Sequence, residues 1–193
     1  MGRTREAALS GAVEAVTKYG SRKATMGDVA MLAGIAKATL YNHFRTKDDV
    51  YAAVVEAEVE AIAAAAFAKL PNGFDVALAE AAAMIAESPA VRRVAAQEPA
   101  VAAGLATLGE GNGWTSARAH VARALQQAGL DASSGAVDVV LRYLASQVLA
   151  PSGPAERAAA AALITGAVAS SRDEARAEPA PDSAQADSSD TSS

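Results

Sequence analysis

A short segment near the N-terminus, GIAKATLYNHFRTKDDV, gathers hydrogen-bonding side chains at close spacing and holds few large apolar ones. On a helical wheel at about 100° per residue, Leu40 and Phe44 fall within one narrow arc, and Ala38 and Asn42 lie opposite them. The outward face therefore has small side chains at its centre and side chains with hydrogen-bond donors around them. This profile is typical of a helix that enters the major groove of DNA.

Each type of side chain on this face has a counterpart on duplex DNA. Lys37 can donate to guanine O6 or N7, and Asn42 can pair bidentately with adenine. Ala38 or Thr39 can touch a thymine methyl group. Further groups are placed to reach phosphates, namely the side chains of Tyr41, His43 and Lys47 and the backbone N–H groups at the helix starts near Thr25 and Lys47.

The same residues also have structural interpretations that the pattern alone leaves open. Isolated Lys and Asn side chains on a short helix usually form a solvated face. His43 lies close to the buried arc, where it could support the first helix, and Tyr41 could pack as an ordinary half-buried aromatic.

Three helices must position this segment. An apolar stripe predicts a first helix over residues 4–19, which Gly20 ends in a left-handed cap. Thr25, with Asp28 three residues later, resembles a capping box and opens a second helix. A third is expected over residues 36–44. Three short helices joined by tight turns describe a helix-turn-helix.

Composition favours an all-α protein without a metal or cofactor. Of the 193 residues, 51% are hydrophobic but only 4% aromatic, so alanine and aliphatic residues dominate. The chain has no cysteine, which excludes disulfides and thiolate ligands, and its two histidines leave little room for a metal centre.

Charge is divided unevenly along the chain. Residues 1–50 hold eight Lys and Arg against five Asp and Glu, which gives +3, whereas the other 143 residues hold nine against seventeen, which gives −8. A basic first quarter on an acidic remainder indicates an anionic partner at one end.

The rest of the chain reads as further helices. A fourth starts at Thr46 or Lys47 and ends before LPNG, and others are expected at 75–87, 90–97, from 99, at 114–128, from 133 or 134, and at 154–169. From about residue 172 the chain lacks large apolar side chains, which predicts a disordered acidic tail.

The last two helices carry apolar stripes between many small residues, which suits a four-helix homodimer interface. The residues in these stripes are Val137, Leu141, Leu144, Val148, Leu163 and Val168. The alternative is that both faces pack within one subunit.

A ligand pocket is expected in this second region, for a small, mostly apolar molecule. The candidate contacts are its few large or polar side chains, each of which could instead belong to the core or the surface: Phe67, Phe74, Met84, Trp114, Arg118, His120 and Tyr143.

The order of residues in TMGDVAMLAGIAKATLYNHFRTKDDVY resembles the TetR/AcrR family of bacterial transcription regulators. The family pattern has a capping Thr or Ser, then apolar–Ala–x–x–Ala–Gly–apolar, then Thr–apolar–Tyr–x–His–Phe and a Lys. The match covers about the first 55 residues. It implies a three-helix DNA-binding head, a longer helical ligand-binding domain and a homodimer built mainly from the last two helices.

Carried over by position, the resemblance assigns DNA contacts to six residues and variable base-reading positions to two. The six are Thr25, Lys37, Thr39, Tyr41, His43 and Lys47, and the two are Ala38 and Asn42. Two departures reduce the expected contacts. Ala36 stands where Ser is common, which removes a side-chain cap worth about 1 kcal/mol, and Gly27 offers no side chain.

The expected domains are a helix-turn-helix head over 1–47, an effector-binding and dimerisation domain over 48–171, and the tail over 172–193. The resemblance implies a ligand-responsive repressor that binds a palindromic operator as a dimer. We expect it to be cytoplasmic, because the N-terminus lacks an apolar signal core and no apolar run reaches membrane-spanning length. The alternatives are a sensing or protein-binding module with a weakened head, and an enzyme, which no pair of residues at diagnostic spacing supports.

Overall fold

The computed structural model describes residues 2–109 and 113–177, with side chains up to residue 169, and in these ranges it is helical without strands. The predicted all-α class is confirmed. The elements are α1 (Gly2–Tyr19), α2 (Met26–Leu32), α3 (Lys37–His43), α4 (Lys47–Lys69), the 3₁₀ helix η1 (Leu70–Asn72), α5 (Phe74–Glu87), α6 (Pro89–Gln97), α7 (Pro99–Ala106), α8 (Trp114–Gln127), α9 (Ser134–Leu149) and α10 (Pro154–Ala177).

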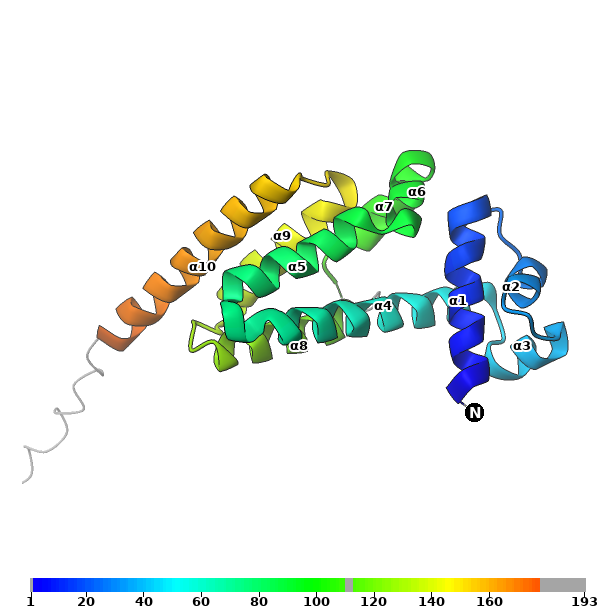
Figure 1. Ribbon diagram of the computed structural model, residues 1–193, viewed down its shortest axis with the longest axis horizontal. Coiled ribbons are helices and arrows are strands. Elements are labelled where there is room, and N and C mark those ends of the chain that lie inside the picture. The colour runs from blue at the N-terminus through cyan, green and yellow to red at the C-terminus, as the bar shows by residue number, and fades with distance from the viewer. Residues whose placement is uncertain (1, 110–112, 178–193) are drawn as a thin grey trace, which may run out of the picture.

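Helices α1, α2 and α3 form a head at one end of the molecule. α1 crosses the N-terminal end of α4, and α2 and α3 lie on the side of α1 that faces away from the other helices (Figure 1). Small alanines of α1 allow this close packing, and the head core joins them to three larger side chains: Val29, Leu40 and Val50, all fully buried.

Local capping signals set the helix starts in the head. Thr25 caps α2 and Thr46 caps α4, and in both cases the side chain of an Asp three residues later returns the bond to the cap backbone. Each box satisfies two orphan N–H groups. α3 begins after Ala36 with no side-chain cap, as expected from its sequence.

Helices α4–α10 form the body. α4 leaves the head as one continuous helix, with α5 and α8 against it, and α10 lies along α5 (Figure 1). Leu125, Val140 and Leu141 are at the centre of the body core. Within α4 only Val50 is buried, because the apolar residues further along the helix line a cavity: Val54, Val55, Val59 and Ile62.

The structure bears on two expectations. α10 continues to Ala177, beyond the predicted end at residue 169, and residues 178–193 of the expected tail lie outside the described residues. Five of the six residues predicted for the dimer interface are buried within this one chain, which favours the alternative that their faces pack inside one subunit: Val137, Leu141, Leu144, Val148 and Val168.

The described residues contain neither a membrane span nor a cluster of metal ligands. No described helix combines the length and apolar character needed to cross a bilayer. The same part of the chain brings together no group of three acidic, histidine or cysteine side chains that could hold a metal ion.

Candidate DNA-binding surface and effector cavity

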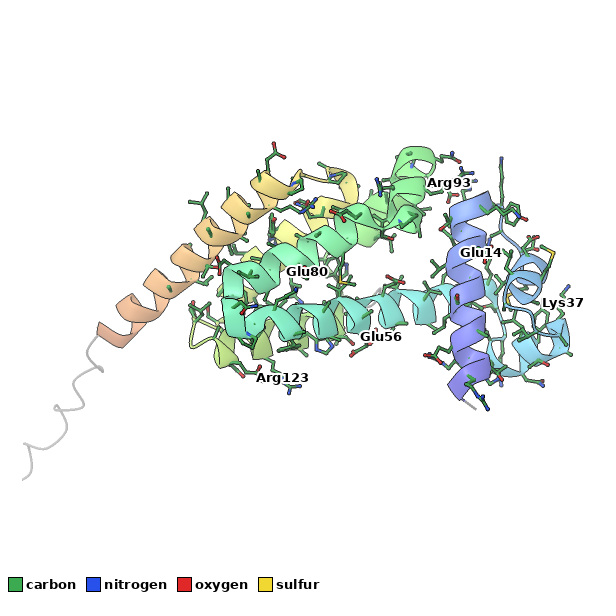
Figure 2. All side chains as sticks on the ribbon, in the orientation of Figure 1. Glu14, Lys37, Glu56, Glu80, Arg93 and Arg123 are labelled. Carbon is green, nitrogen blue, oxygen red and sulfur yellow. The ribbon has the colours of Figure 1, made fainter. Side chains whose placement is uncertain are left out.

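Helix α3 presents most of its side chains to solvent at the outer end of the head. Lys37, Ala38, Asn42 and His43 are exposed and Tyr41 is 45% exposed. Figure 2 shows Lys37 at the end of the molecule farthest from the body. The exposed face of this helix therefore has a small side chain at its centre and hydrogen-bond donors around it. No other part of the described chain covers this face.

Two side chains fasten α3 to the rest of the head from the opposite side. Leu40 is fully buried and Phe44 is 6% exposed. The Arg5 guanidinium carbon lies 5.8 Å from the Phe44 ring centroid, and the Lys37 Nζ lies 5.9 Å from the Tyr41 ring centroid. Because His43 is exposed, it does not support α1 as one interpretation of the sequence had it.

Two of the predicted DNA contacts are engaged within the protein. The Thr25 hydroxyl accepts from the Asp28 backbone N–H at 3.2 Å and donates to the Asp28 carboxylate at 2.6 Å. The Lys47 ammonium donates to the Ser21 carbonyl at 3.0 Å and to the Arg22 carbonyl at 3.2 Å. Both side chains hold the frame of the head, whereas the exposed side chains of α3 are free of such contacts with the α1–α2 turn.

The α1–α2 turn, residues 20–25, is held from both α4 and the α6–α7 junction. The Tyr51 hydroxyl donates to the Ser21 carbonyl at 3.0 Å. The Glu98 carboxylate accepts from the Ser21 hydroxyl and from the Arg22 backbone N–H at 3.2 Å. We call the contact between Glu98 and this turn the head clamp. It ties a residue of the body directly to the head.

Two groups beside the α1–α2 turn have shifted pKa values. Burial acts to raise the pKa of the Glu98 carboxyl, but the hydrogen bonds from Ser21 and Arg22 outweigh it, so that this pKa lies below its ordinary value. Burial, followed by the nearby Glu98 carboxylate, raises the pKa of Tyr51 to about 12. Sequence reasoning missed Glu98, because nothing local marks a residue that acts 76 positions away.

A cavity of about 310 Å³ lies in the body between α4, α5, α8 and α9. Five of the seven predicted ligand contacts line it: Phe67, Phe74, Met84, Trp114 and His120. The other two lie elsewhere. Arg118 pairs with Asp138, and Tyr143 donates to the Arg157 carbonyl at 3.3 Å. The volume falls at the lower end of the range of small-molecule sites.

The cavity also reaches the head. Val13 and Val16 of α1, together with Ser21 and Tyr51 at the head clamp, belong to its lining. The same space is bounded by α6 and α7, through residues that include Val94 and Val101 on either side of Glu98. A molecule in the cavity would therefore touch the elements that hold the α1–α2 turn.

The wall between α4 and α8 is joined by two polar contacts one helical turn apart. Ser116 donates to Glu56, and His120 Nε2 lies 2.8 Å from Glu60 Oε1. Figure 2 shows Glu56 on α4 alongside α8. This seam closes one side of the cavity.

Comparisons with known proteins agree with this geometry. Residues 8–54 match the family model of bacterial regulatory proteins, tetR family, which confirms the resemblance carried by the head. No curated protein sequence matches the chain.

Solved structures share the fold over most of the chain. The TetR family repressor AlkX from a Dietzia species, implicated in biodegradation of n-alkanes, has a TM-score of 0.65 at 19% identity, covering 85% of this chain and 94% of that one. A putative TetR-family regulator from a Rhodococcus species has a TM-score of 0.62 at 20% identity, covering 88% and 100%. The fatty acid degradation regulator FadR from Bacillus halodurans has a TM-score of 0.55 at 14% identity, covering 87% and 95%.

Proposed function

We propose that this chain, whose head is that of the tetR family of bacterial regulatory proteins, is a transcription repressor that binds a palindromic operator as a dimer and leaves it when a small, mostly apolar effector enters the body. The observation that carries the proposal is the exposed face of α3, which is small at its centre, rich in donors and anchored from behind by Leu40 and Phe44.

In this proposal the bases are read by α3 alone. Lys37 donates to guanine, Asn42 pairs with adenine and Ala38 or Thr39 meets a thymine methyl. Tyr41, His43 and the N-termini of α2 and α4 approach phosphates. Thr25 and Lys47 act mainly by fixing the frame on which α3 sits.

Three exposed aliphatic side chains on the last two helices support the homodimer. Val139 is 48% exposed and Leu149 54%, on the side of α9 opposite its buried face, and Leu163 on α10 is 76% exposed. A second copy placed there would set two α3 helices for half-sites about 34–36 Å apart, one turn of DNA.

Effector control follows from the shared walls of the cavity. A molecule between α4, α5 and α8 shifts α4 and the α6–α7 junction, and both hold the α1–α2 turn through Tyr51 and Glu98. A small rotation of each head changes the distance between the two recognition helices, and affinity for the operator falls.

A crosslink tests this control. Because the chain has no cysteine, Glu56→Cys combined with Ser116→Cys introduces one bond between α4 and α8, whose side chains are in contact there. The oxidised double variant is expected to bind operator but not to be released by effector, and reduction restores release. Release that is equal in both redox states would remove α4 from the mechanism.

The decisive experiment measures binding anisotropy on DNA fragments flanking the gene, at two salt concentrations. Tight, salt-dependent binding to one fragment is expected. Asn42→Ala is expected to lower affinity by about 10-fold to 100-fold and to relax the preference at one base pair. Lys37→Ala should act similarly. Lys69→Ala and Asn72→Ala, at exposed positions of the body, are the matched controls.

A protein-binding or sensing module with a weakened head is the second candidate, favoured by the missing cap at Ala36. Weak binding that is equal on all fragments and unchanged by Asn42→Ala would select it. Ala36→Ser separates the two further, because a restored cap worth about 1 kcal/mol should tighten specific binding of a repressor but leave a non-reading head unchanged.

A further inference from the structure

We infer that the cavity selects an uncharged, largely aliphatic molecule and excludes the carboxylate of the same chain length. The inference rests on the proposed function only in taking this cavity as the effector site, and it adds the chemical class of the effector. The evidence for it is the set of residues that line the cavity and the hydrogen-bond partners that the polar residues among them already have.

Aliphatic and aromatic side chains make up most of the cavity wall, with Val, Ala, Leu and Ile predominating. No Lys or Arg of the described chain belongs to the lining. Arg123 comes near the outside of the wall, where its guanidinium carbon lies 5.3 Å from the Phe67 ring centroid, but it is exposed and lies on the outside of α8 (Figure 2). An anion in the cavity would therefore meet no permanent cation.

The polar groups at the head end of the cavity are engaged by the protein. The Ser21 hydroxyl donates to Glu98, and the Tyr51 hydroxyl donates to the Ser21 carbonyl at 3.0 Å. The Ser88 hydroxyl accepts from the Val91 N–H at 3.4 Å. The Ser21 and Tyr51 hydroxyls donate to groups that hold the α1–α2 turn, so a carboxylate could accept from them only by breaking those contacts. Ser88 caps its helix as an acceptor and keeps its own proton.

The polar groups of α4 and α8 also disfavour an anion. Glu58 is an exposed acidic residue that belongs to the lining, and its charge disfavours a second carboxylate nearby. His120 Nε2 is paired with Glu60 at 2.8 Å. A carboxylate at this nitrogen would have to displace Glu60. A neutral hydroxyl or carbonyl group can lie beside these polar side chains without the cost of removing a charge from water. An unpaired buried charge, in contrast, is strongly disfavoured.

The size of the cavity sets the length of the molecule. A volume of about 310 Å³ corresponds to at least about ten methylene-sized groups, if each occupies roughly the 30 Å³ of a water molecule in the liquid. A ten-carbon chain is therefore the natural probe length.

The protein carries its own reporter of occupancy. Trp114 is the single tryptophan of the chain, lines the cavity and is 8% exposed. Its indole N–H donates to the Leu105 carbonyl at 3.0 Å, which fixes the ring in the wall. Binding in the cavity changes the surroundings of this ring, so its fluorescence emission can be titrated without any label.

The test titrates the full chain with decan-1-ol and with decanoate near neutral pH, each below the concentration at which it forms aggregates, and follows Trp114 emission. Decan-1-ol is expected to bind at least about 100-fold more tightly than decanoate, because only decanoate buries a charge. Binding of decanoate equal to or tighter than that of decan-1-ol would overturn the inference, and so would the absence of binding by decan-1-ol.

Two neighbouring alanines of α4 provide matched variants. Ala63 lines the cavity, whereas Ala64 is exposed and outside it. Ala63→Leu fills part of the space and is expected to weaken decan-1-ol binding by at least about tenfold, while Ala64→Leu leaves it unchanged. Equal effects of the two substitutions would place the binding site elsewhere and overturn the inference.

The failure of this inference can be told from failure of the proposed function, because Trp114 titrations need no DNA. If decan-1-ol binds selectively but operator complexes persist, the ligand class stands and effector release is wrong. If decanoate binds selectively and releases the operator, the proposed function stands and the ligand class is wrong.

Discussion

Gly20→Ala tests whether the head clamp stabilises the head. Gly20 has a φ of +84°, where an added Cβ would overlap the Glu98 Oε1 atom. Gly34 has a φ of +64°, but a Cβ there would meet nothing within 4 Å. Substitution of either glycine therefore strains a backbone of positive φ, and only Gly20 adds a displaced carboxylate.

The expected costs follow from these two terms. An L-residue in the left-handed region costs about 1–2 kcal/mol, which applies to Gly20→Ala and Gly34→Ala alike. Displacing Glu98 removes charge-assisted hydrogen bonds worth about 1 kcal/mol once their partial exposure is discounted. We expect losses of unfolding free energy of about 2–3 kcal/mol for Gly20→Ala and about 1–2 kcal/mol for Gly34→Ala.

Urea unfolding followed by far-UV circular dichroism measures the difference. With a slope of about 2 kcal/mol per molar, the midpoint for Gly20→Ala should lie about 0.5 M below that for Gly34→Ala. In a Glu98→Ala background the two substitutions should become equal, because no carboxylate remains to be displaced. Equal midpoints in the wild-type background, or a difference that survives in Glu98→Ala, would refute the head clamp as a source of stability.

Three further predictions concern separate features. Thr46→Ala should destabilise the protein by about 1 kcal/mol in urea unfolding, because it removes the capping box of α4. Because burial raises the pKa of Tyr51 to about 12 from 10.0, its stabilising contribution is complete below pH 10.0 and lost as the pH rises toward about 12, and Tyr51→Phe should remove the last-ionising phenol in an absorbance titration. Leu163→Glu should shift the dimer toward monomer in sedimentation, whereas Val76→Glu, at another exposed apolar position, should not.

The head could be predicted closely because its signals are local. The caps at Thr25 and Thr46 and the left-handed turn at Gly20 each depend on residues within a few positions, and the structure has all three. The missing cap at Ala36 is confirmed for the same reason.

The body could not be predicted to the same depth because periodicity identifies an apolar face but not what covers it. The stripe of α4 that includes Val55 and Val59 lines a cavity instead of a packed core, and Leu141 and Leu144 of α9 face their own subunit. The head clamp joins Ser21 and Glu98, far apart in the chain, and no local pattern encodes that meeting.

The residues of α3 and its C-terminal cap fall into a buried set and an exposed set. Leu40 and Phe44 attach it to the head, while the exposed residues around Asn42 make no contribution to the core. With seven residues and no side-chain cap, the helix owes its order to those two anchors. The outward residues can therefore be exchanged with little effect on the fold, so that under the proposed function one scaffold could acquire new operator preferences by a few substitutions.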